Sequence, residues 1–357
     1  MVDRNFWRGK KVFVTGHTGF KGAWLSHWLH YLGASVTGFS KKPSSQQMQL
    51  MGNTNKFSGG SIIGDICDFQ HLTDSVKQSQ SEIIFHLAAQ PIVRRSYDSA
   101  IETFETNLMG TVHLLETMKH AESLRAAVIV TSDKCYNNFD VGVPFIEDSP
   151  LGGDDPYSAS KACAEIATQS FIRSFFTGTC NRSNQVKIAT ARAGNIIGGG
   201  DWGEDRLIPD IVRAIQLGEN IQIRSPQAIR PWQFVLDALS GYMMLAERLY
   251  SEGDKFVGAW NFGPDSTQFW TVKKVVQKFC TPLDPKVDFE NTADDTKKEK
   301  KLLTLDTSKA NVQLAWVPKF PITTFLPRTR QWYEMILQGT DADILCKQEL
   351  DYYQTFR

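Results

Sequence analysis

The sequence predicts an α/β fold in which a doubly wound parallel sheet is combined with a smaller, interleaved C-terminal lobe. In the first half of the chain, short β-branched runs alternate with longer helical patterns, an order typical of parallel strands joined by helices. The expected strands are almost continuously apolar, as strands are when helices cover both faces of a sheet.

The expected elements follow one another in a simple order. Five strands are predicted from the segments KVFVTG, ASVTGFS, SIIGD, EIIFHLAA and AAVIVTS, with a helix near Lys21 to Leu32 after the first. A later helix should begin near Asp155, and the strand VKIATARAG follows it. After Gly194, loops rich in glycine, proline and tryptophan separate shorter elements, which indicates a second lobe.

Composition excludes several classes of protein. The chain has 357 residues, of which 41% are hydrophobic and 22% charged, as in ordinary globular proteins. Lys and Arg balance Asp and Glu at 39 each, so we expect neither nucleic acid nor a membrane as a partner. The six cysteines show no C-x-x-C spacing and no export signal is recognised, which favours a cytoplasmic protein with reduced thiols and no metal site.

A glycine-rich segment joins the first expected strand to the first long helix. Gly16, Gly19 and Gly22 form a G-x-x-G-x-x-G pattern. Glycines in this position allow a tight turn and let backbone N–H groups and the helix N-terminus approach a pyrophosphate. The pattern predicts a Rossmann-type dinucleotide site.

The end of the second strand leaves the choice of dinucleotide open. An acid at this point binds the ribose 2′-hydroxyl of NAD, whereas a base suits the 2′-phosphate of NADP. Here the strand ends in Ser40, Lys41 and Lys42, without an acid.

A second group of residues predicts acid–base chemistry. Tyr157 and Lys161 are four residues apart and therefore lie on one face of the expected helix. An ammonium group beside the phenol would favour the phenolate and lower the pKa of Tyr157. Ser132, at the end of the fifth strand, would bind the same substrate hydroxyl.

Ser132, Tyr157 and Lys161 together resemble the Ser-Tyr-Lys triad of the short-chain dehydrogenase/reductase family, and Asn107 resembles the asparagine that often accompanies it. The segments ARAGNIIGGGDWGEDR, AIRPWQFVLD and WNFGP resemble the nucleotide-sugar enzymes of its extended branch, the NAD-dependent epimerases and dehydratases. The resemblance decides for NAD as the cofactor. It implies an NAD-binding Rossmann domain over residues 1–194, to which elements at about 231–262 return, and a mainly nucleotide-sugar-binding lobe over residues 195–357.

The resemblance also assigns residues to the two ligands. The predicted cofactor-binding residues are Gly16, His17, Thr18, Gly19, Phe20, Gly22, Ser40, Lys41, Asp65, Ile66, Leu87, Ala88, Ala89, Asn107, Tyr157 and Lys161. The predicted substrate-binding residues are Gln90, Asn195, Arg206 and Arg230. Arginine suits a diphosphate because its planar donors bind oxygens in pairs.

Asp133 and Lys134 indicate the branch of the family. In the thymidine-linked glucose 4,6-dehydratases, the residue matching Ser132 is followed by an Asp-Glu pair that acts as acid and base in the elimination. This chain keeps the Asp and has Lys134 in place of the Glu. With HTGFKGAWL and GNIIGGGDW, the pair resembles the CDP-glucose 4,6-dehydratases, and the resemblance extends to LDTSKA near Asp306.

That resemblance implies the catalytic set Ser132, Asp133, Lys134, Tyr157 and Lys161. The implied reaction converts CDP-D-glucose to CDP-4-keto-6-deoxy-D-glucose by oxidation at C4, loss of water across C5–C6 and return of hydride to C6. It further implies a homodimer or homotetramer and a role in the deoxysugar biosynthesis of lipopolysaccharide O-antigen.

Three questions stay open at this point. An ordinary lysine is protonated at neutral pH, so the base at C5 is either Lys134 or His17 of the glycine loop. A nucleotide-sugar 4-epimerase or reductase would share the fold, the cofactor and the Tyr157–Lys161 pair. A non-catalytic dinucleotide-sensing module would keep the glycine loop, but it has little reason to retain the triad.

Overall fold

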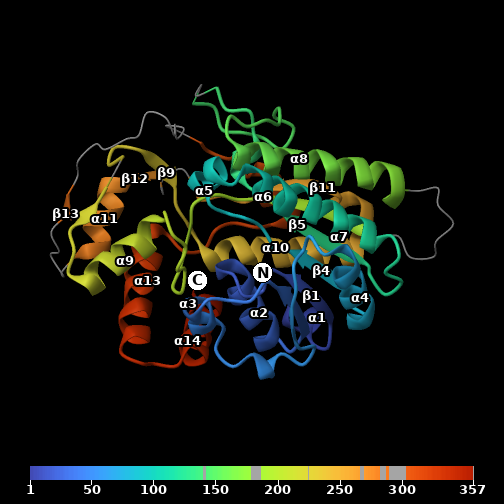
Figure 1. Ribbon diagram of the computed structural model, residues 1–357, viewed down its shortest axis with the longest axis horizontal. Helices are drawn as coiled ribbons and strands as arrows, with labels where there is room; N and C mark the ends of the chain where they lie inside the picture. The colour runs from blue at the N-terminus through green and yellow to red at the C-terminus, as the bar shows by residue number, and fades with distance from the viewer. Residues whose placement is uncertain are drawn as a thin grey trace.

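The computed structural model describes residues 1–139, 142–177, 186–223, 225–265, 269–281, 287–288 and 303–356. A seven-stranded parallel sheet lies at its centre (Figure 1), which confirms the predicted fold class. The strand order is β11-β6-β5-β4-β1-β2-β3. The strands are β1 (Lys11–Thr15), β2 (Ser35–Ser40), β3 (Ser61–Ile63), β4 (Ile83–His86), β5 (Ala126–Val130), β6 (Lys187–Arg192) and β11 (Gly258–Asn261).

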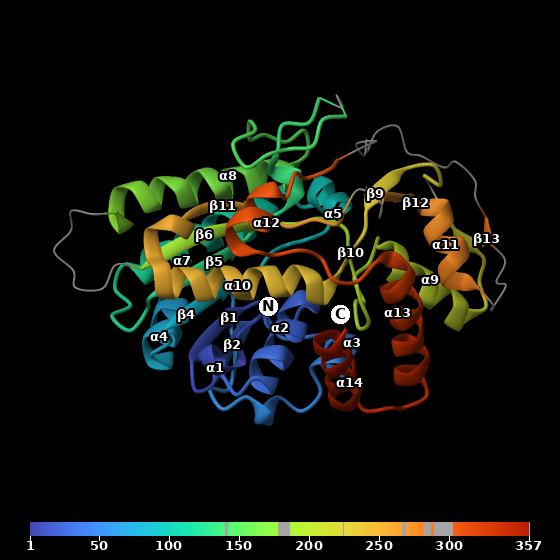
Figure 2. The same ribbon diagram turned by 180° about the vertical axis from the view of Figure 1, so that it is seen from behind.

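Helices cover both faces of this sheet. Successive residues of β1 are buried on opposite sides: Val12 and Val14 pack with α2 (Phe20–Tyr31) and α10 (Val235–Glu252), and Phe13 packs with α4 (Phe69–Ser79) and α7 (Gly110–Met118). Figures 1 and 2 show α10 and α8 (Pro156–Phe171) on opposite sides of β5 and β6. An apolar residue is needed at every strand position because both faces are dry.

The helix that carries Tyr157 begins where the sequence predicts. The side chain of Asp155 caps α8 by accepting the N–H of Ser158 at 2.9 Å, and Pro156 occupies the first helical position. Both are favourable N-terminal signals, because proline lacks the N–H that a first turn leaves unpaired.

Shorter elements gather at one end of the sheet, beside α9 (Leu207–Leu217) and α13 (Ile322–Leu337) in Figure 2. Three two-stranded sheets lie outside the main one: β7 (Ile196–Ile197) with β10 (Gln233–Phe234), β9 (Ile229–Pro231) with β12 (Phe269–Thr271), and β8 (Ile221–Gln222) with β13 (Val287–Asp288). The division into lobes at residues 194 and 195 stays a prediction.

The remaining elements complete the chain. The α-helices are α1 (Arg4–Trp7), α3 (Ser45–Met51), α5 (Val93–Asp98), α6 (Ala100–Phe104), α11 (Val272–Cys280), α12 (Ser308–Leu314) and α14 (Ala342–Thr355). The other helical turns are η1 (Thr54–Lys56), η2 (Glu105–Met109), η3 (Asp133–Cys135), η4 (Ile172–Phe176) and η5 (Gly253–Phe256), of which η2 and η4 are π-helical.

Five of the six cysteines fall in the described residues and all five are free; Cys180 lies outside them. Within the same residues, no helix combines the length and the apolar character needed to cross a bilayer. The described part of the chain also contains no cluster of three His, Cys, Asp or Glu side chains suited to a metal ion.

Candidate active site

The sheet order places a cleft at its carboxyl edge. β1 and β4 are neighbours, and the chain proceeds from them toward opposite edges, a topological switch point at which ligands bind in doubly wound folds. A cleft of about 2730 Å³ opens there, between the glycine loop, the ends of β4 and β5, and residues of the 194–232 segment. Since one small ligand needs roughly 300–1,000 Å³, this cleft has room for a dinucleotide and a second ligand together.

The glycine loop is shaped for close approach of backbone to ligand. Gly16 has φ +70°, and a Cβ there would lie 2.7 Å from the backbone nitrogen of Ala88. A Cβ at Gly22 would lie 2.1 Å from the carbonyl oxygen of Gly16. Helix α2 begins after Gly19 without any side-chain cap, so its first N–H groups remain to bind an anion beside Phe20 in the cleft wall.

Most of the predicted cofactor residues line the cleft. They include Thr18, Phe20, Ser40, Lys41, Ile66, Leu87, Ala88 and Ala89. The hydroxyls of Thr18 and Ser40 are 2.5 Å apart, which joins the glycine loop to the end of β2. Lys41 forms an ion pair with Asp65 at 3.1 Å, so the basic end of β2 is partly neutralised by the acid after β3.

His17 does not have the place that the C5-base hypothesis requires. Its fully buried ring lies against β2, where a Cβ on Gly38 would overlap it, and Nε2 bonds the hydroxyl of Ser61 at 2.7 Å. His17 is not part of the cleft lining. Burial lowers its pKa to about 4, so the ring is neutral, but it packs beneath the loop and cannot reach a substrate.

Asn107 and Gln90 hold the backbone instead of offering their amides to a ligand. Asn107 lies on the π-helical turn η2 and is buried; its amide accepts the N–H of Gln90 at 2.8 Å and donates to Ser160 at 2.9 Å. It is absent from the cleft lining, so the described contacts give its predicted cofactor contact no support, and that contact stays a prediction. Gln90 lines the cleft, but its side-chain amide is bonded to Ile92 and Thr103. These bonds hold the amide away from its predicted contact with the substrate.

Ser132, Asp133 and Lys134 follow β5 after Thr131, and all three line the cleft. Ser132 donates from its hydroxyl to Oδ1 of Asp133 at 3.0 Å and caps η3 by accepting the N–H of Lys134. Asp133 is 1% exposed, and its Oδ2 has no hydrogen-bond partner within the described residues. Nζ of Lys134 lies 3.8 Å from Oδ1 of Asp133, so acid and amine stand side by side.

Tyr157, on α8, lies close to Ser132, Asp133 and Lys134. Burial raises the pKa of its phenol, while a hydrogen bond with Ser132 and the charge of Lys134 act to lower it. The sequence predicted a lowered pKa for Tyr157, but in the protein without ligands this pKa is raised, because desolvation of the phenolate outweighs these contacts. Lys161 is also buried; its Nζ lies 3.4 Å from the carbonyl oxygen of Val130, and burial lowers its pKa to about 8.

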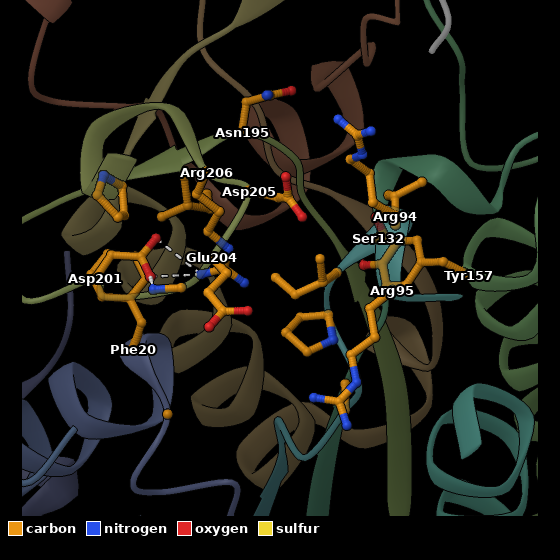
Figure 3. A pocket seen from close by; sticks show the side chains of 18 of the residues that line it. Phe20, Arg94, Arg95, Ser132, Tyr157, Asn195, Asp201, Glu204, Asp205 and Arg206 are labelled. Carbon is orange, nitrogen blue, oxygen red and sulfur yellow. Dashed lines mark hydrogen bonds and ion pairs between the residues drawn. The ribbon is translucent and has the colours of Figure 1, made fainter. Parts of the chain in front are cut away.

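The predicted phosphate-binding residues all line the cleft, and Arg206 does so opposite the catalytic candidates. Figure 3 shows Asp201 and Arg206 across the pocket from Ser132 and Tyr157. Both guanidinium bonds from Arg206 to Asp201, at 2.8 and 2.9 Å, use one terminal nitrogen, which leaves further donors for a ligand. Arg230 and Asn195 also line the cleft, and Asn195 has φ +37°, a strained conformation typical of functional sites.

Sequence reasoning missed three cations of the cleft. Lys21 lies within the glycine motif, and burial, together with the charges of Lys161 and Arg206, lowers its pKa to about 7. Arg94 and Arg95, at the start of α5, also line the pocket (Figure 3). An ionisable residue inside a glycine motif was a visible signal for Lys21, whereas nothing in the local pattern marked Arg94 and Arg95.

The comparison with protein families agrees with this geometry. A family model described as GDP-mannose 4,6 dehydratase matches residues 13–329. The chain belongs to this dehydratase family. Its Ser132, Asp133, Lys134 and Tyr157 all lie within the matched residues.

Three of the relatives match the chain over at least nine tenths of its length. The CDP-glucose 4,6-dehydratase of Salmonella typhimurium is 46% identical over 356 residues, 99% of each chain. The dTDP-glucose 4,6-dehydratase of Haemophilus influenzae is 25% identical, over 90% of this chain and 97% of the relative. Among solved structures, a Streptomyces venezuelae dTDP-glucose 4,6-dehydratase with NAD and TYD bound has a TM-score of 0.75 at 22% identity, over 93% of this chain and 99% of that one.

Proposed function

We propose that the protein is an NAD-dependent CDP-glucose 4,6-dehydratase that converts CDP-D-glucose to CDP-4-keto-6-deoxy-D-glucose. One observation carries the proposal: the hydroxyl pair of Ser132 and Tyr157 and the acid–amine pair of Asp133 and Lys134 share one wall of a single cleft. An oxidation at C4 needs the first pair, and an elimination across C5–C6 needs the second. The identity of 46% to the Salmonella enzyme supports the choice of CDP-glucose.

The residues present fit NAD. The tight turn at Gly16 and the uncapped N-terminus of α2 suit its pyrophosphate, and Ser40 and Ile66 line the cleft on the side of β2 and β3. When bound, NAD would supply the hydride acceptor for C4 and the hydride donor for C6, so that it is regenerated in each turnover. Its positive charge would also favour the phenolate of Tyr157.

Tyr157 takes the proton of the sugar 4-hydroxyl, and Ser132 orients that hydroxyl. The proximity of Ser132 to the Tyr157 phenol, which acts to lower the phenol's pKa, supports this joint role. Lys161, one turn further along α8, stabilises the phenolate through its positive charge.

Asp133 and Lys134 then carry the elimination. Once C4 is a ketone, the hydrogen on C5 is acidic, and Asp133 protonates the departing 6-hydroxyl while Lys134 removes the C5 proton. The ion pair at 3.8 Å has the amine in its protonated form, but transfer of one proton within the pair gives a neutral acid and a neutral amine. A substrate that excludes water favours this neutral form, because burying charge is costly.

The cations of the opposite wall suit the nucleotide diphosphate. Arg206 is held by Asp201, and Arg230 and Asn195 lie nearby along the 194–232 segment. We include the two arginines in the proposed diphosphate site because guanidinium groups bind phosphate oxygens in pairs, and Asn195 as a neutral hydrogen-bonding residue of the same segment.

A panel of nucleotide-linked glucoses tests the function. Protein stripped of nucleotide should form a 4-keto-6-deoxy product from CDP-glucose when NAD⁺ is restored, and mass spectrometry of the sugar should show the loss of one water. A 4-epimerase would return a hexose of unchanged mass, and activity restored by NADP⁺ alone would contradict the cofactor assignment.

Substitution of Gly16 by Ala should weaken NAD binding by at least about tenfold, because the methyl group meets the backbone of Ala88 at 2.7 Å and the positive φ disfavours it. Gly9→Ala is the matched control, since Gly9 has a similar φ of +75° and nothing within 4 Å of its Cβ position. Titration of NAD⁺ by fluorescence quenching measures both. Equal affinities for the two variants would remove the glycine loop from the cofactor site.

The remaining proposals concern assembly and pathway. The predicted homodimer or homotetramer stays a prediction. A role in the deoxysugar biosynthesis of lipopolysaccharide O-antigen follows from the proposed product and stays a prediction.

A further inference from the structure

An ion pair lies completely buried behind the side of the cleft that carries Ser132, Asp133, Lys134 and Tyr157, called here the catalytic wall. Glu165 of α8 and Arg192 of β6 meet at 2.7 Å, and both side chains are 0% exposed. The carboxylate also accepts the hydroxyls of Thr131 at 2.5 Å and Thr190 at 2.8 Å. The reaction as described above uses neither charge, although burying a pair of this kind is costly.

The pair holds both ends of the segment that carries the catalytic residues. At one end, Glu165 accepts the hydroxyl of Thr131, the residue before Ser132. At the other end, Arg192 donates at 2.7 Å to the hydroxyl of Tyr136, the residue after η3. Tyr136 in turn donates to Asn261 of β11 at 2.6 Å. Residues 131 and 136 are therefore fixed from one buried point, with Ser132, Asp133 and Lys134 between them.

Glu165 also acts on the helix that supplies the phenol. Tyr157, Lys161 and Glu165 recur at intervals of four residues on α8, so they lie along one face. Burial lowers the pKa of Lys161 and the charge of Glu165 opposes this effect. No direct contact joins these two side chains among the described interactions, so the influence is electrostatic.

Other titratable groups near Lys161 come from three elements. His86 of β4 and the thiol of Cys135 in η3 are neutral at working pH, because burial lowers the pKa of His86 to about 3 and raises that of Cys135. Lys21 of α2 lies near Lys161, and burial together with the charge of Lys161 lowers the pKa of Lys21 to about 7. Glu165 is thus the nearby negative charge that supports the ammonium form of Lys161.

We propose that Glu165, paired with Arg192, is a positioning residue of the reaction: it fixes the 131–136 segment and keeps Lys161 charged beside Tyr157. The inference rests on the proposed function, since it assigns Tyr157 the role of proton acceptor. The expected signature is a change in pH dependence, because loss of the carboxylate lets Lys161 lose its proton at lower pH. The phenol of Tyr157, which also faces Asp133, Lys134 and Arg206, should then ionise only at higher pH.

The test compares Glu165→Gln with Thr190→Val. Glu165→Gln removes the charge of the carboxylate. Thr190→Val removes one hydrogen bond to the same carboxylate and leaves every charged side chain in place. The pH midpoint of NADH formation from CDP-glucose should rise by about one unit in Glu165→Gln. It should be unchanged in Thr190→Val, even if the rate falls at every pH. An unmoved midpoint in Glu165→Gln would overturn the proposal.

A second readout does not depend on turnover. The ultraviolet difference absorbance between each protein and its Tyr157→Phe counterpart isolates the ionisation of Tyr157, which should occur at higher pH in Glu165→Gln than in the parent. If the parent oxidises no nucleotide-linked glucose, the proposed function fails while this titration still decides the role of Glu165. Should Glu165→Gln not fold because Arg192 is left unpaired, Glu165→Gln/Arg192→Met removes both charges, and an unchanged phenol titration there would equally contradict the proposal.

Discussion

Tyr157→Phe should abolish oxidation at C4 and with it every later step. The hydroxyl is the proposed acceptor of the sugar proton, and a group of this kind contributes about a hundredfold to ten-thousandfold. Tyr136 also lines the cleft, but its hydroxyl is bonded to Asn261 and Arg192, so it does not replace Tyr157 and we expect the upper end of this range. The ring is buried and stays in place in the variant, so folding and nucleotide binding should persist.

The measurement is the absorbance of NADH on mixing enzyme with excess CDP-glucose, together with product formation. Tyr31→Phe is a suitable control, because the hydroxyl of Tyr31 bonds Asp351 at the other end of α2, away from the cleft. Near-normal turnover by folded Tyr157→Phe would remove the central element of the mechanism.

Asp133→Asn should separate the two halves of the reaction. In the protein, the hydroxyl of Ser132 donates to the Asp133 carboxylate at 3.0 Å, and the oxygen of an asparagine amide can accept the same bond. The amide cannot, however, protonate the departing 6-hydroxyl. Turnover should fall by about a hundredfold to ten-thousandfold, while the first hydride transfer continues. Bound NADH and a 4-keto-glucose intermediate should therefore accumulate.

The test follows the nicotinamide absorbance over time and analyses the bound sugar after quenching. Absorbance that rises and persists supports the role of Asp133 as acid. Absence of any NADH signal would place Asp133 in the oxidation step or in folding. Unchanged product formation would show that the Asp133–Lys134 contact is only an ion pair.

Local sequence patterns were sufficient for the scaffold and for the residues that lie on it. The strand segments, the glycine loop before α2 and the Asp155 cap of α8 all have short-range signals, and the structure has each of them in place. The positions of Tyr157 and Lys161 on one face follow from helix periodicity alone.

The environment of each side chain was not determined by these patterns. Asn107 and His17 have residue types suited to binding, but their polar atoms face the protein interior. Arg94 reaches the cleft only because α5 follows β4 beside Tyr157 on α8, a relation between segments more than sixty residues apart.

The sequence by itself thus predicted the fold class, the dinucleotide loop and the residues proposed here as catalytic, because each has a signal in the local pattern. Only the tertiary structure decided which of these groups share a cleft, which are turned inward, and how burial shifts the pKa of Lys21, Lys161 and Tyr157. It also revealed the pair of Glu165 and Arg192 behind the catalytic wall. These properties depend on desolvation and on charges brought together from distant parts of the chain, which no local pattern contains.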